Sequence, residues 1–189
     1  MSEETNAESS STLRADQLRG IATVLETCDE RQAATTYERA LHLDPNDVAT
    51  WVAFARLQSR RGSLSAARRA LENALTFATA KRDRSVVHSE LGDLDLTEGN
   101  LISARRHYLA GMEIDRELAQ FDPENRGWQR DSSVSLDKLG DVALALGDFV
   151  AARDHYAAGL AIRERLASSD ASNSEWQRDL SVSRNRLGD

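Results

Sequence analysis

The chain has 189 residues, of which 40% are hydrophobic and 29% are charged, and its formal net charge is −7 at pH 7. This acidic balance does not favour a general attraction to nucleic acid or to anionic membranes. A single cysteine, Cys28, excludes an internal disulfide and fits a reducing compartment, so we expect a cytoplasmic protein.

Residues 1–12 are rich in Ser and Glu and contain neither a basic start nor an apolar stretch. They therefore do not have the pattern of a signal peptide or a membrane anchor, and we interpret them as a disordered acidic tail. From residue 13 onward, apolar residues recur with helical spacing, and no segment shows the period-2 alternation of a strand. Both prolines, Pro45 and Pro123, stand in Asp-Pro steps between apolar runs. The fold class predicted is all-α.

The apolar runs and their turn signals predict nine helices in chain order. Their expected ranges are 13–27, 30–43, 46–61, 64–79, 84–98, 101–121, 127–146, 149–168 and 174–189. The chain is also a repeat. The segment from Trp128 to Asp131 returns as Trp176 to Asp179, an offset of 48 residues, and residues 82–125 match residues 130–173 in the same register without a gap. A fixed period of this size predicts a stack of equivalent helical hairpins.

An earlier part of the chain has a shorter repeat pattern. It sets an aromatic residue, small residues, a turn glycine and further apolar residues at fixed spacing, namely Trp51, Phe54, Ala55, Gly62, Leu64, Ala67, Leu71 and Ala74. This pattern resembles the tetratricopeptide repeat. The later 48-residue units resemble the bacterial long-helix type of that family, which carries WQRD and LGD segments.

The resemblance implies a right-handed α-solenoid of antiparallel helix pairs, with four complete repeats and a final single helix. We expect one repeat domain over residues 13–189, with units at about 14–47, 48–81, 85–132 and 133–180 and a partial unit at 181–189. An uncapped final helix leaves open a homodimer through the C-terminal edge.

The resemblance also implies that the first helices of successive units line a concave groove. Transferring the groove positions of the family selects Val52, Arg56, Arg60, Ser89, Asp93, Thr97, Asp137, Asp141, Leu144 and Asn185 as candidate partner-binding residues. One hypothesis is that Arg56 and Arg60 bind a carboxylate of the partner, because the planar guanidinium makes two hydrogen bonds to that group. In the same hypothesis Asp93, Asp137 and Asp141 receive a basic stretch. The plainer interpretation is that Arg56 and Arg60 pair with Glu90 and Asp93 and only stabilise the stack.

The sequence contains no phosphate-binding glycine loop, no GxSxG or HExxH motif and no Cys/His cluster, so we expect no catalytic residues, no metal site and no cofactor. His107 and His155 recur at the repeat period, but they fall on different units and lack the short ligand spacing of a zinc site. They are interpreted as structural. His42 and His88 have no partner motif.

These observations favour a non-catalytic adaptor that binds a peptide or a helix of a partner protein in its groove. Two alternatives stay open. Residues 48–84 hold eight Lys or Arg against two acids, a local charge of +6 that leaves −13 for the rest of the chain, so a nucleic-acid-binding helical repeat is one of them. The other is a self-associating fragment of a larger signalling protein.

Overall fold

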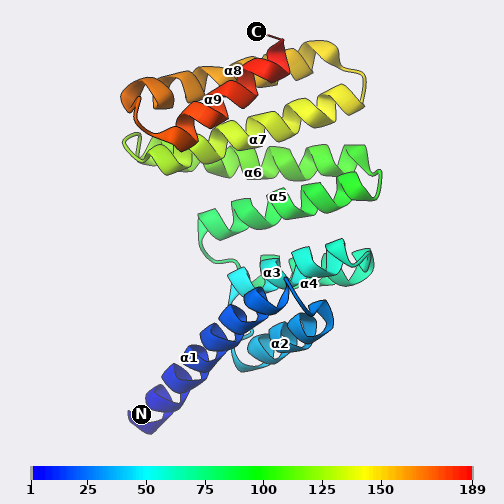
Figure 1. The fold of residues 1–189 in the computed structure, drawn as a ribbon, viewed down its shortest axis with the longest axis vertical. Coiled ribbons are helices and arrows are strands. Elements are labelled where there is room, and N and C mark those ends of the chain that lie inside the picture. Colours follow the sequence, from blue (N-terminus) through cyan, green and yellow to red (C-terminus); the bar gives the residue numbers. More distant parts are fainter. Residues whose placement is uncertain (1, 189) are drawn as a thin grey trace. The chain divides into compact units, whose positions relative to one another are not determined.

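The structure, a computed structural model, describes the backbone of residues 2–188 and the side chains of residues 10–188. Met1, the first residue of the predicted tail, and Asp189, the last residue of the predicted final helix, lie outside the described residues. Within residues 2–188 the chain forms nine α-helices and no strand, which confirms the all-α prediction (Figure 1). Their bounds are α1 (Ser2–Leu25), α2 (Glu30–Leu43), α3 (Val48–Arg60), α4 (Leu64–Phe77), α5 (Lys81–Thr97), α6 (Leu101–Phe121), α7 (Arg126–Ala145), α8 (Phe149–Ser169) and α9 (Ser174–Leu187). Among the described residues, none of these helices combines the length and the apolar character that crossing a membrane requires.

The largest difference from the predicted boundaries is at the N-terminus. Helix α1 begins at Ser2, so residues 2–12, expected to be a disordered tail, continue the helix that was predicted from residue 13. Residues 2–12 contain no proline or glycine, and their Ser, Glu and Ala residues cost a helix less than about 1 kcal/mol each. The helix formed by the packed residues that follow can therefore extend into residues 2–12.

The helices form two compact units, Met1–Asp83 and Arg84–Asp189. The first unit contains the hairpins α1–α2 (hairpin 1) and α3–α4 (hairpin 2). The second contains α5–α6 (hairpin 3), α7–α8 (hairpin 4) and α9, stacked side by side in that order (Figure 1). The expectation that residues 13–189 form one continuous array stays a prediction.

Glycine closes the turn inside hairpins 2, 3 and 4. Gly62, Gly99 and Gly147 have φ values of 75°, 80° and 79°, the left-handed region in which a Cβ is strained. Each follows the first helix of its hairpin and reverses the chain within three residues. In hairpin 1 the same turn contains Cys28 and Asp29, and the Asp29 side chain caps α2 by accepting hydrogen bonds from two backbone N–H groups.

A second pair of glycines sets the distance between the two helices of a hairpin. The Tyr108 ring of α6 lies so close to Gly92 of α5 that a Cβ at Gly92 would overlap it. Tyr156 of α8 meets Gly140 of α7 in the same way. Tyr108 and Tyr156 are buried, and each belongs to a hydrophobic core cluster of the second unit, with Ala104 and Ala152 respectively. A large ring packed on a bare backbone lets the helices approach closely.

A buried polar network joins each of the two long hairpins to the following helix. In hairpin 3, Asp115 of α6 accepts hydrogen bonds from Ser85 of α5 and from Ser135 of α7, the latter at 2.6 Å. In hairpin 4, Arg163 of α8 donates to Asp137 of α7 at 2.6 Å and also to Ser183 of α9. Three pairs of residues in these networks are equivalent at the 48-residue offset: Ser85 with Ser133, Asp115 with Arg163, and Ser135 with Ser183. An acid at one interface is thus replaced by a base at the next.

Candidate interaction surface

Hairpin 3 and α7 share a triad of an acid, a tyrosine and a cation. The Tyr108 hydroxyl donates to Asp93 Oδ1 at 2.6 Å. Lys138 of α7 donates from Nζ to both carboxylate oxygens of Asp93, at 2.9 and 2.7 Å, and to Ser89 Oγ at 2.7 Å. The same Nζ lies 5.4 Å from the centroid of the Tyr108 ring, within the range of a cation–π contact. The triad therefore ties the first helix of the next hairpin to both helices of hairpin 3.

Hairpin 4 and α9 repeat this triad at the 48-residue offset. The Tyr156 hydroxyl donates to Asp141 Oδ1 at 2.7 Å, and Arg186 of α9 donates to the same oxygen. The Arg186 guanidinium lies 5.5 Å from the centroid of the Tyr156 ring. Lys138 and Arg186 differ by 48 residues, as do the two tyrosines and the two acids, so the triad is a property of the repeat.

The first unit contains a shorter version. The Tyr37 hydroxyl of α2 donates to Glu26 Oε1 at 2.5 Å, and Arg60 of α3 donates to the other carboxylate oxygen of Glu26. Glu26 follows the end of α1, so the acid again lies at the end of the first helix and the cation comes from the next hairpin. Arg60, selected from the sequence for partner binding, thus has an internal acid as its partner.

The pKa of all three tyrosines of the chain is raised. Burial is the largest cause in each case, and the hydrogen bond to the acid adds to it, because both disfavour the phenolate. The pKa of Tyr37 and that of Tyr156 rise from 10 to about 12. The pKa of Tyr108 is raised further, by burial first and then by the hydrogen bond to Asp93 and the charges of Asp93, Asp141 and Glu90. At neutral pH each tyrosine is therefore a hydrogen-bond donor and each acid an acceptor.

The ten residues selected from the sequence have different environments. The exposed ones are Arg56, Arg60, Thr97, Leu144 and Asn185, and the half-buried ones are Ser89, Asp93 and Asp141. Val52 and Asp137 are buried, so they do not belong to a partner-binding surface in this structure. Asp137 is buried because Arg163 reaches it from α8 and neutralises it. Arg60 pairs with Glu26, and Asp93 pairs with Lys138. The pairing of Arg56 and Arg60 with Glu90 and Asp93 stays a prediction.

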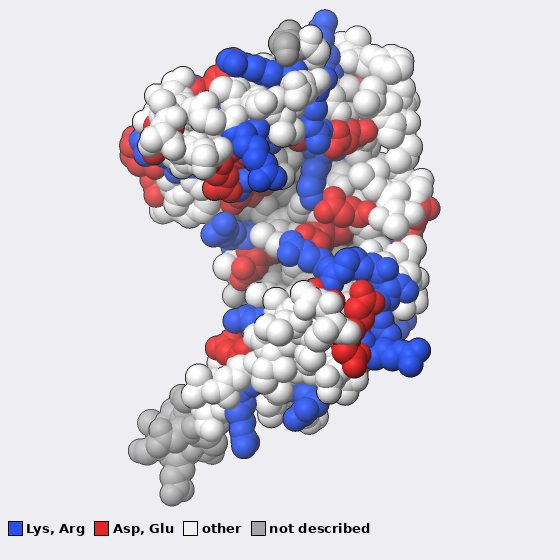
Figure 2. Space-filling view, in the orientation of Figure 1, with Lys and Arg blue, Asp and Glu red and all other residues white. Residues whose placement is uncertain are grey.

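Sequence reasoning missed the partners in these triads. Glu26, Lys138 and Arg186 were not selected, although Lys138 and Arg186 follow the selected Asp93 and Asp141 by 45 residues in both copies. Such a constant spacing between opposite charges was the available signal. The charges also alternate on the visible face: Figure 2 shows basic and acidic side chains next to one another over the second unit. In the second unit, Asp93, Lys138, Asp141 and Arg186 form two pairs of opposite charges at the repeat offset, which we call the triad ladder.

A histidine pair lies inside hairpin 3. His88 Nδ1 of α5 and His107 Nδ1 of α6 are 3.2 Å apart, so His88 has a partner in space although it has no partner motif in the sequence. Burial, followed by the neighbouring His107 and Arg84, lowers the pKa of His88. The sequence did not show the pair because its residues come from different helices of one hairpin.

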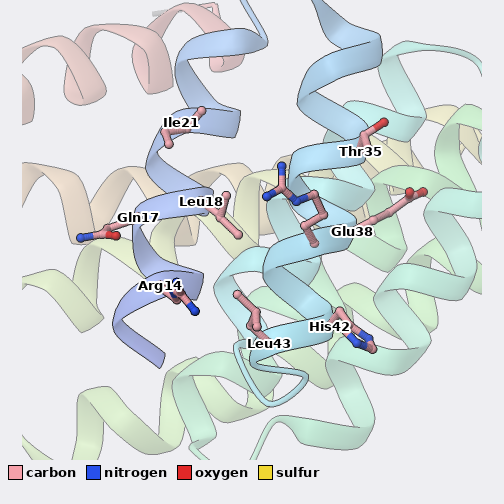
Figure 3. A pocket seen from close by; sticks show the side chains of 9 residues that line it. Arg14, Gln17, Leu18, Ile21, Thr35, Glu38, His42 and Leu43 are labelled. Atoms are coloured by element: carbon pink, nitrogen blue, oxygen red, sulfur yellow. The ribbon is translucent and has the colours of Figure 1, made fainter. Parts of the chain in front are cut away.

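A hollow of about 670 Å³ lies between α1 and α2 (Figure 3). Leu18, Ile21 and Leu43 provide its apolar part, while Arg14 and Glu38 are among its polar residues. In the part of the chain that is described, no group of three or more His, Cys, Asp or Glu residues has the arrangement of a metal site. The hollow is mainly an apolar surface between two helices.

Solved structures with the same arrangement of helices were found. BtubC (BKLC) from P. vanneervenii has a TM-score of 0.68 and 17% identity, and the match covers 98% of this chain and 84% of that one. PilF of Pseudomonas aeruginosa has a TM-score of 0.63 and 18% identity over 92% of this chain and 74% of that one. MamA has a TM-score of 0.58 and 14% identity over 89% and 95%. No protein-family model and no curated protein sequence matches the chain.

At these identities the likeness shows the fold alone. BtubC, PilF and MamA contain tetratricopeptide repeats, so the chain has a tetratricopeptide-like fold of the all-α solenoid type.

Proposed function

We propose that the chain is a non-catalytic scaffold that binds a peptide or a helix of a partner protein along the first helices of its hairpins. The observation that supports this most is the triad ladder. Its carboxylates are held in place by tyrosine and by a cation, yet the side chains of Asp93 and Asp141 stay 45% and 44% exposed. Charged groups that are fixed before binding lose little conformational entropy when a partner arrives.

The ladder also limits the chemistry of the partner. Each acid already has a cation beside it, so the surface has little unbalanced charge to attract a purely basic or purely acidic segment. A segment that alternates charged groups of both signs, or that presents polar groups to the exposed edges of the carboxylates, is complementary to it. We therefore propose a polar, extended segment of a partner protein as the ligand.

In the first unit, Arg56 and Arg60 of α3 are the proposed contacts for a carboxylate of that segment. They are exposed and one helical turn apart, and the side chain of Arg60 is 50% exposed although it pairs with Glu26. The guanidinium has five donors, so pairing with Glu26 leaves others for a ligand. Thr97, Leu144 and Asn185 are exposed on α5, α7 and α9 and complete the proposed surface.

The test is a peptide-display selection with the wild-type chain, followed by affinity measurement by fluorescence anisotropy. The variant Arg56→Glu/Arg60→Glu is expected to weaken the selected peptides at least about tenfold, or about 1.4 kcal/mol. The matched control is Arg61→Glu/Arg69→Glu, which changes the net charge equally at two exposed positions outside the proposed surface. Equal affinity in the wild type and the first variant would remove Arg56 and Arg60 from the surface and favour their structural interpretation.

The nucleic-acid alternative rests on the basic segment 48–84 and is tested with the same variants. An RNA-binding chain would stay on heparin at physiological salt, and the control variant would weaken retention as much as the first one, because phosphate binding depends on the number of cations. Retention of that kind would replace the peptide proposal.

Finer features of the proposal follow from the repeat. We propose that the second unit is of the long-helix type with WQRD and LGD segments, because the triads recur at the 48-residue offset on which that assignment was based. A bacterial, cytoplasmic adaptor without enzymatic activity is the corresponding cellular role. Homodimerisation through the C-terminal edge is a further proposal, and light scattering of the chain with and without residues 176–189 tests it.

A further inference from the structure

One face of α1 is exposed and largely apolar. Gln17, Gly20, Ile21, Val24 and Leu25 line a hollow of about 560 Å³ on this helix, and it shares Gln17 and Ile21 with the hollow between α1 and α2 (Figure 3). Ile21 is 52% exposed and Val24 is 68% exposed. In helical-repeat proteins the terminal repeats present a polar outer face, which keeps the array soluble. The apolar face of α1 is therefore not a cap of that kind.

The tyrosines show which residues of α7 correspond to this face. The Tyr37 hydroxyl lies 3.2 Å from Thr23 Oγ1 of α1. In hairpin 4, the Tyr156 hydroxyl lies 2.7 Å from Asp141 Oδ1 of α7. Aligning Thr23 with Asp141 sets the register between the two helices. The alignment pairs Gln17 with Ser135, Ile21 with Leu139, and Val24 with Val142.

In α7 the corresponding residues are covered by the preceding hairpin. Leu139 and Val142 are 2% and 0% exposed, and they form one core cluster with Tyr108 of α6. In the first unit, Phe54 of α3 likewise meets the ring of Tyr37 of α2, with ring centroids 6.3 Å apart. In both places an aromatic residue from the second helix of one hairpin covers the first helix of the next. The fold therefore shows what kind of helix fits this face.

Gly20 gives a second, independent observation. Of the glycines inside helices in the described part of the chain, Gly20 alone has open space where a Cβ would be. A glycine inside a helix destabilises it relative to alanine, and no internal contact explains this one. At Gly92 and Gly140 the missing Cβ makes room for a tyrosine ring. Gly20, next to Ile21 and Val24 in the hollow, offers the same room to a side chain of another molecule.

We propose that this face of α1, which we call the α1 stripe (Gln17, Gly20, Ile21 and Val24), docks an amphipathic helix of a partner protein. The partner helix presents an aromatic side chain to the stripe, as α6 presents Tyr108 to α7. Because Gly20 has no Cβ, the two helices approach closely there. The stripe shares no residue with the surface proposed above, so the chain has two separate places for protein partners.

The residues beside the stripe determine which charges the partner helix carries. Two arginines, Arg14 and Arg39, and one acid, Glu38, line the hollow between α1 and α2, and all three are exposed. Acidic residues next to the apolar face of the partner helix are complementary to this excess of positive charge. A second copy of the chain fits less well. Among the described residues its exposed aromatic side chains are Phe121 and Phe149, the last residue of α6 and the first of α8, so neither lies within a helix face.

A phage-displayed library of 21-residue peptides, built on the α6 sequence of residues 101–121 with its exposed positions varied, probes the stripe. The selected peptides are then titrated with the full chain by fluorescence anisotropy. We expect enrichment of acidic residues, and at least about tenfold weaker binding to Val24→Glu, because the variant places a charge in an apolar contact. The control Ile102→Glu changes an equally exposed apolar residue of α6 and is expected to keep the affinity.

Gly20→Ala separates docking from folding. The added methyl group meets nothing in the free chain, so thermal stability should not fall. A closely packed partner helix would be pushed away, so the selected peptides should bind at least about fivefold more weakly. Arg14→Glu/Arg39→Glu should weaken the acidic peptides as well, because it reverses the charge beside the stripe.

Failure of the library to yield any peptide for the wild type, or equal affinity of the selected peptides for the wild type and Val24→Glu, would overturn the proposal. Unchanged affinity in Gly20→Ala would contradict the close approach at that residue. Light scattering tests the other occupant. A wild type that is a dimer and a Val24→Glu variant that is a monomer would assign the stripe to a second copy of the chain and overturn the assignment to a partner helix.

Discussion

Hairpins 3 and 4 have the same helical arrangement, but one equivalent buried position holds an acid, Asp115, in hairpin 3 and a base, Arg163, in hairpin 4. Both use a glycine to admit a tyrosine ring, and both hold the following helix with an acid–tyrosine–cation triad. The two hairpins differ in their buried polar networks. Asp115 accepts hydrogen bonds from two serine hydroxyls, whereas Arg163 pairs with the carboxylate of Asp137.

The difference shows which parts of a repeat are free to change. The glycine–tyrosine contact determines the distance between helices, so both copies keep it. The buried polar position has only to be matched within its own interface. An acid with two hydroxyl donors is one solution and an arginine with a carboxylate is another. A helix exchanged between the two interfaces would bury an unmatched charge, so the polar networks favour the correct order of stacking.

The largest expected effect comes from breaking the match in hairpin 4. Arg163→Leu leaves Asp137 buried without its hydrogen-bonded cation, with only Arg186 Nε at 3.7 Å. A broken buried pair of this kind costs about 3–5 kcal/mol. The side chains of Arg163 and Asp137 are 6% and 9% exposed, so solvent screens the loss very little. The free energy of unfolding from urea denaturation, followed by circular dichroism, measures it.

A double variant sharpens the same comparison. Arg163→Asp with Asp137→Ser gives hairpin 4 the pattern of hairpin 3, where Asp115 and Ser89 occupy these two positions. Because Ser133 and Ser183 already stand where Ser85 and Ser135 do, the introduced carboxylate has hydroxyl donors nearby. We expect the double variant to be more stable than Arg163→Leu. A double variant no more stable than Arg163→Leu would mean that the two networks are not interchangeable.

The feature common to both hairpins gives the next largest effect. Gly92→Ala and Gly140→Ala each place a methyl group against a tyrosine ring, and overpacking of this kind costs about 1–3 kcal/mol. The two losses should be similar, because the contact is the same in both copies. Gly20→Ala is the control: Gly20 lies within α1 with open space around its Cβ position, so this change should stabilise by about 0.4–1 kcal/mol. Unequal losses at Gly92 and Gly140 would contradict the equivalence of the two hairpins.

Much of this fold could be predicted from the sequence because its causes are local or periodic. Apolar spacing and the turn glycines, such as Gly62 and Gly147, locate helices, and eight of the nine begin within about three residues of the predicted start, the usual uncertainty of helix ends. The 48-residue offset identified Gly140 and Tyr156 as the counterparts of Gly92 and Tyr108. The equivalence of the two glycine–tyrosine contacts follows from this offset.

The surface was harder to predict because it depends on which side chains reach one another across helices. Asp137 was expected to be solvent-exposed, as most acids are, but the long side chain of Arg163 reaches it from the next helix. His88 was set aside because its partner, His107, is 19 residues away in the chain although it is adjacent in space. Pairs of this kind follow from the angle and the register of two helices, which a linear pattern does not give.

The smallest expected effect concerns ionisation of the triads. A tyrosine with a folded-state pKa above its ordinary value of 10 contributes stability that is fully present below pH 10 and is lost as the pH rises through the folded-state pKa. For Tyr37 and Tyr156 that window ends at about 12, and the pKa of Tyr108 is also raised. Because these are the three tyrosines of the chain, an absorbance titration near 295 nm should show no phenolate at pH 10 while the protein is folded.

Asp141→Asn separates hairpin 4 from hairpin 3 in that titration. Removing the carboxylate takes away the negative charge that opposes the phenolate of Tyr156, while Arg186 stays beside the ring to favour it. The pKa of Tyr156 should fall, and one tyrosine of three should ionise earlier than the others. The pKa of Tyr108 should fall much less, because Asp141 is a minor cause of its shift and its own acid, Asp93, is intact. Early ionisation of two tyrosines in this variant would mean that the triads are coupled along the ladder, whereas ionisation of one shows that each triad acts within its own hairpin.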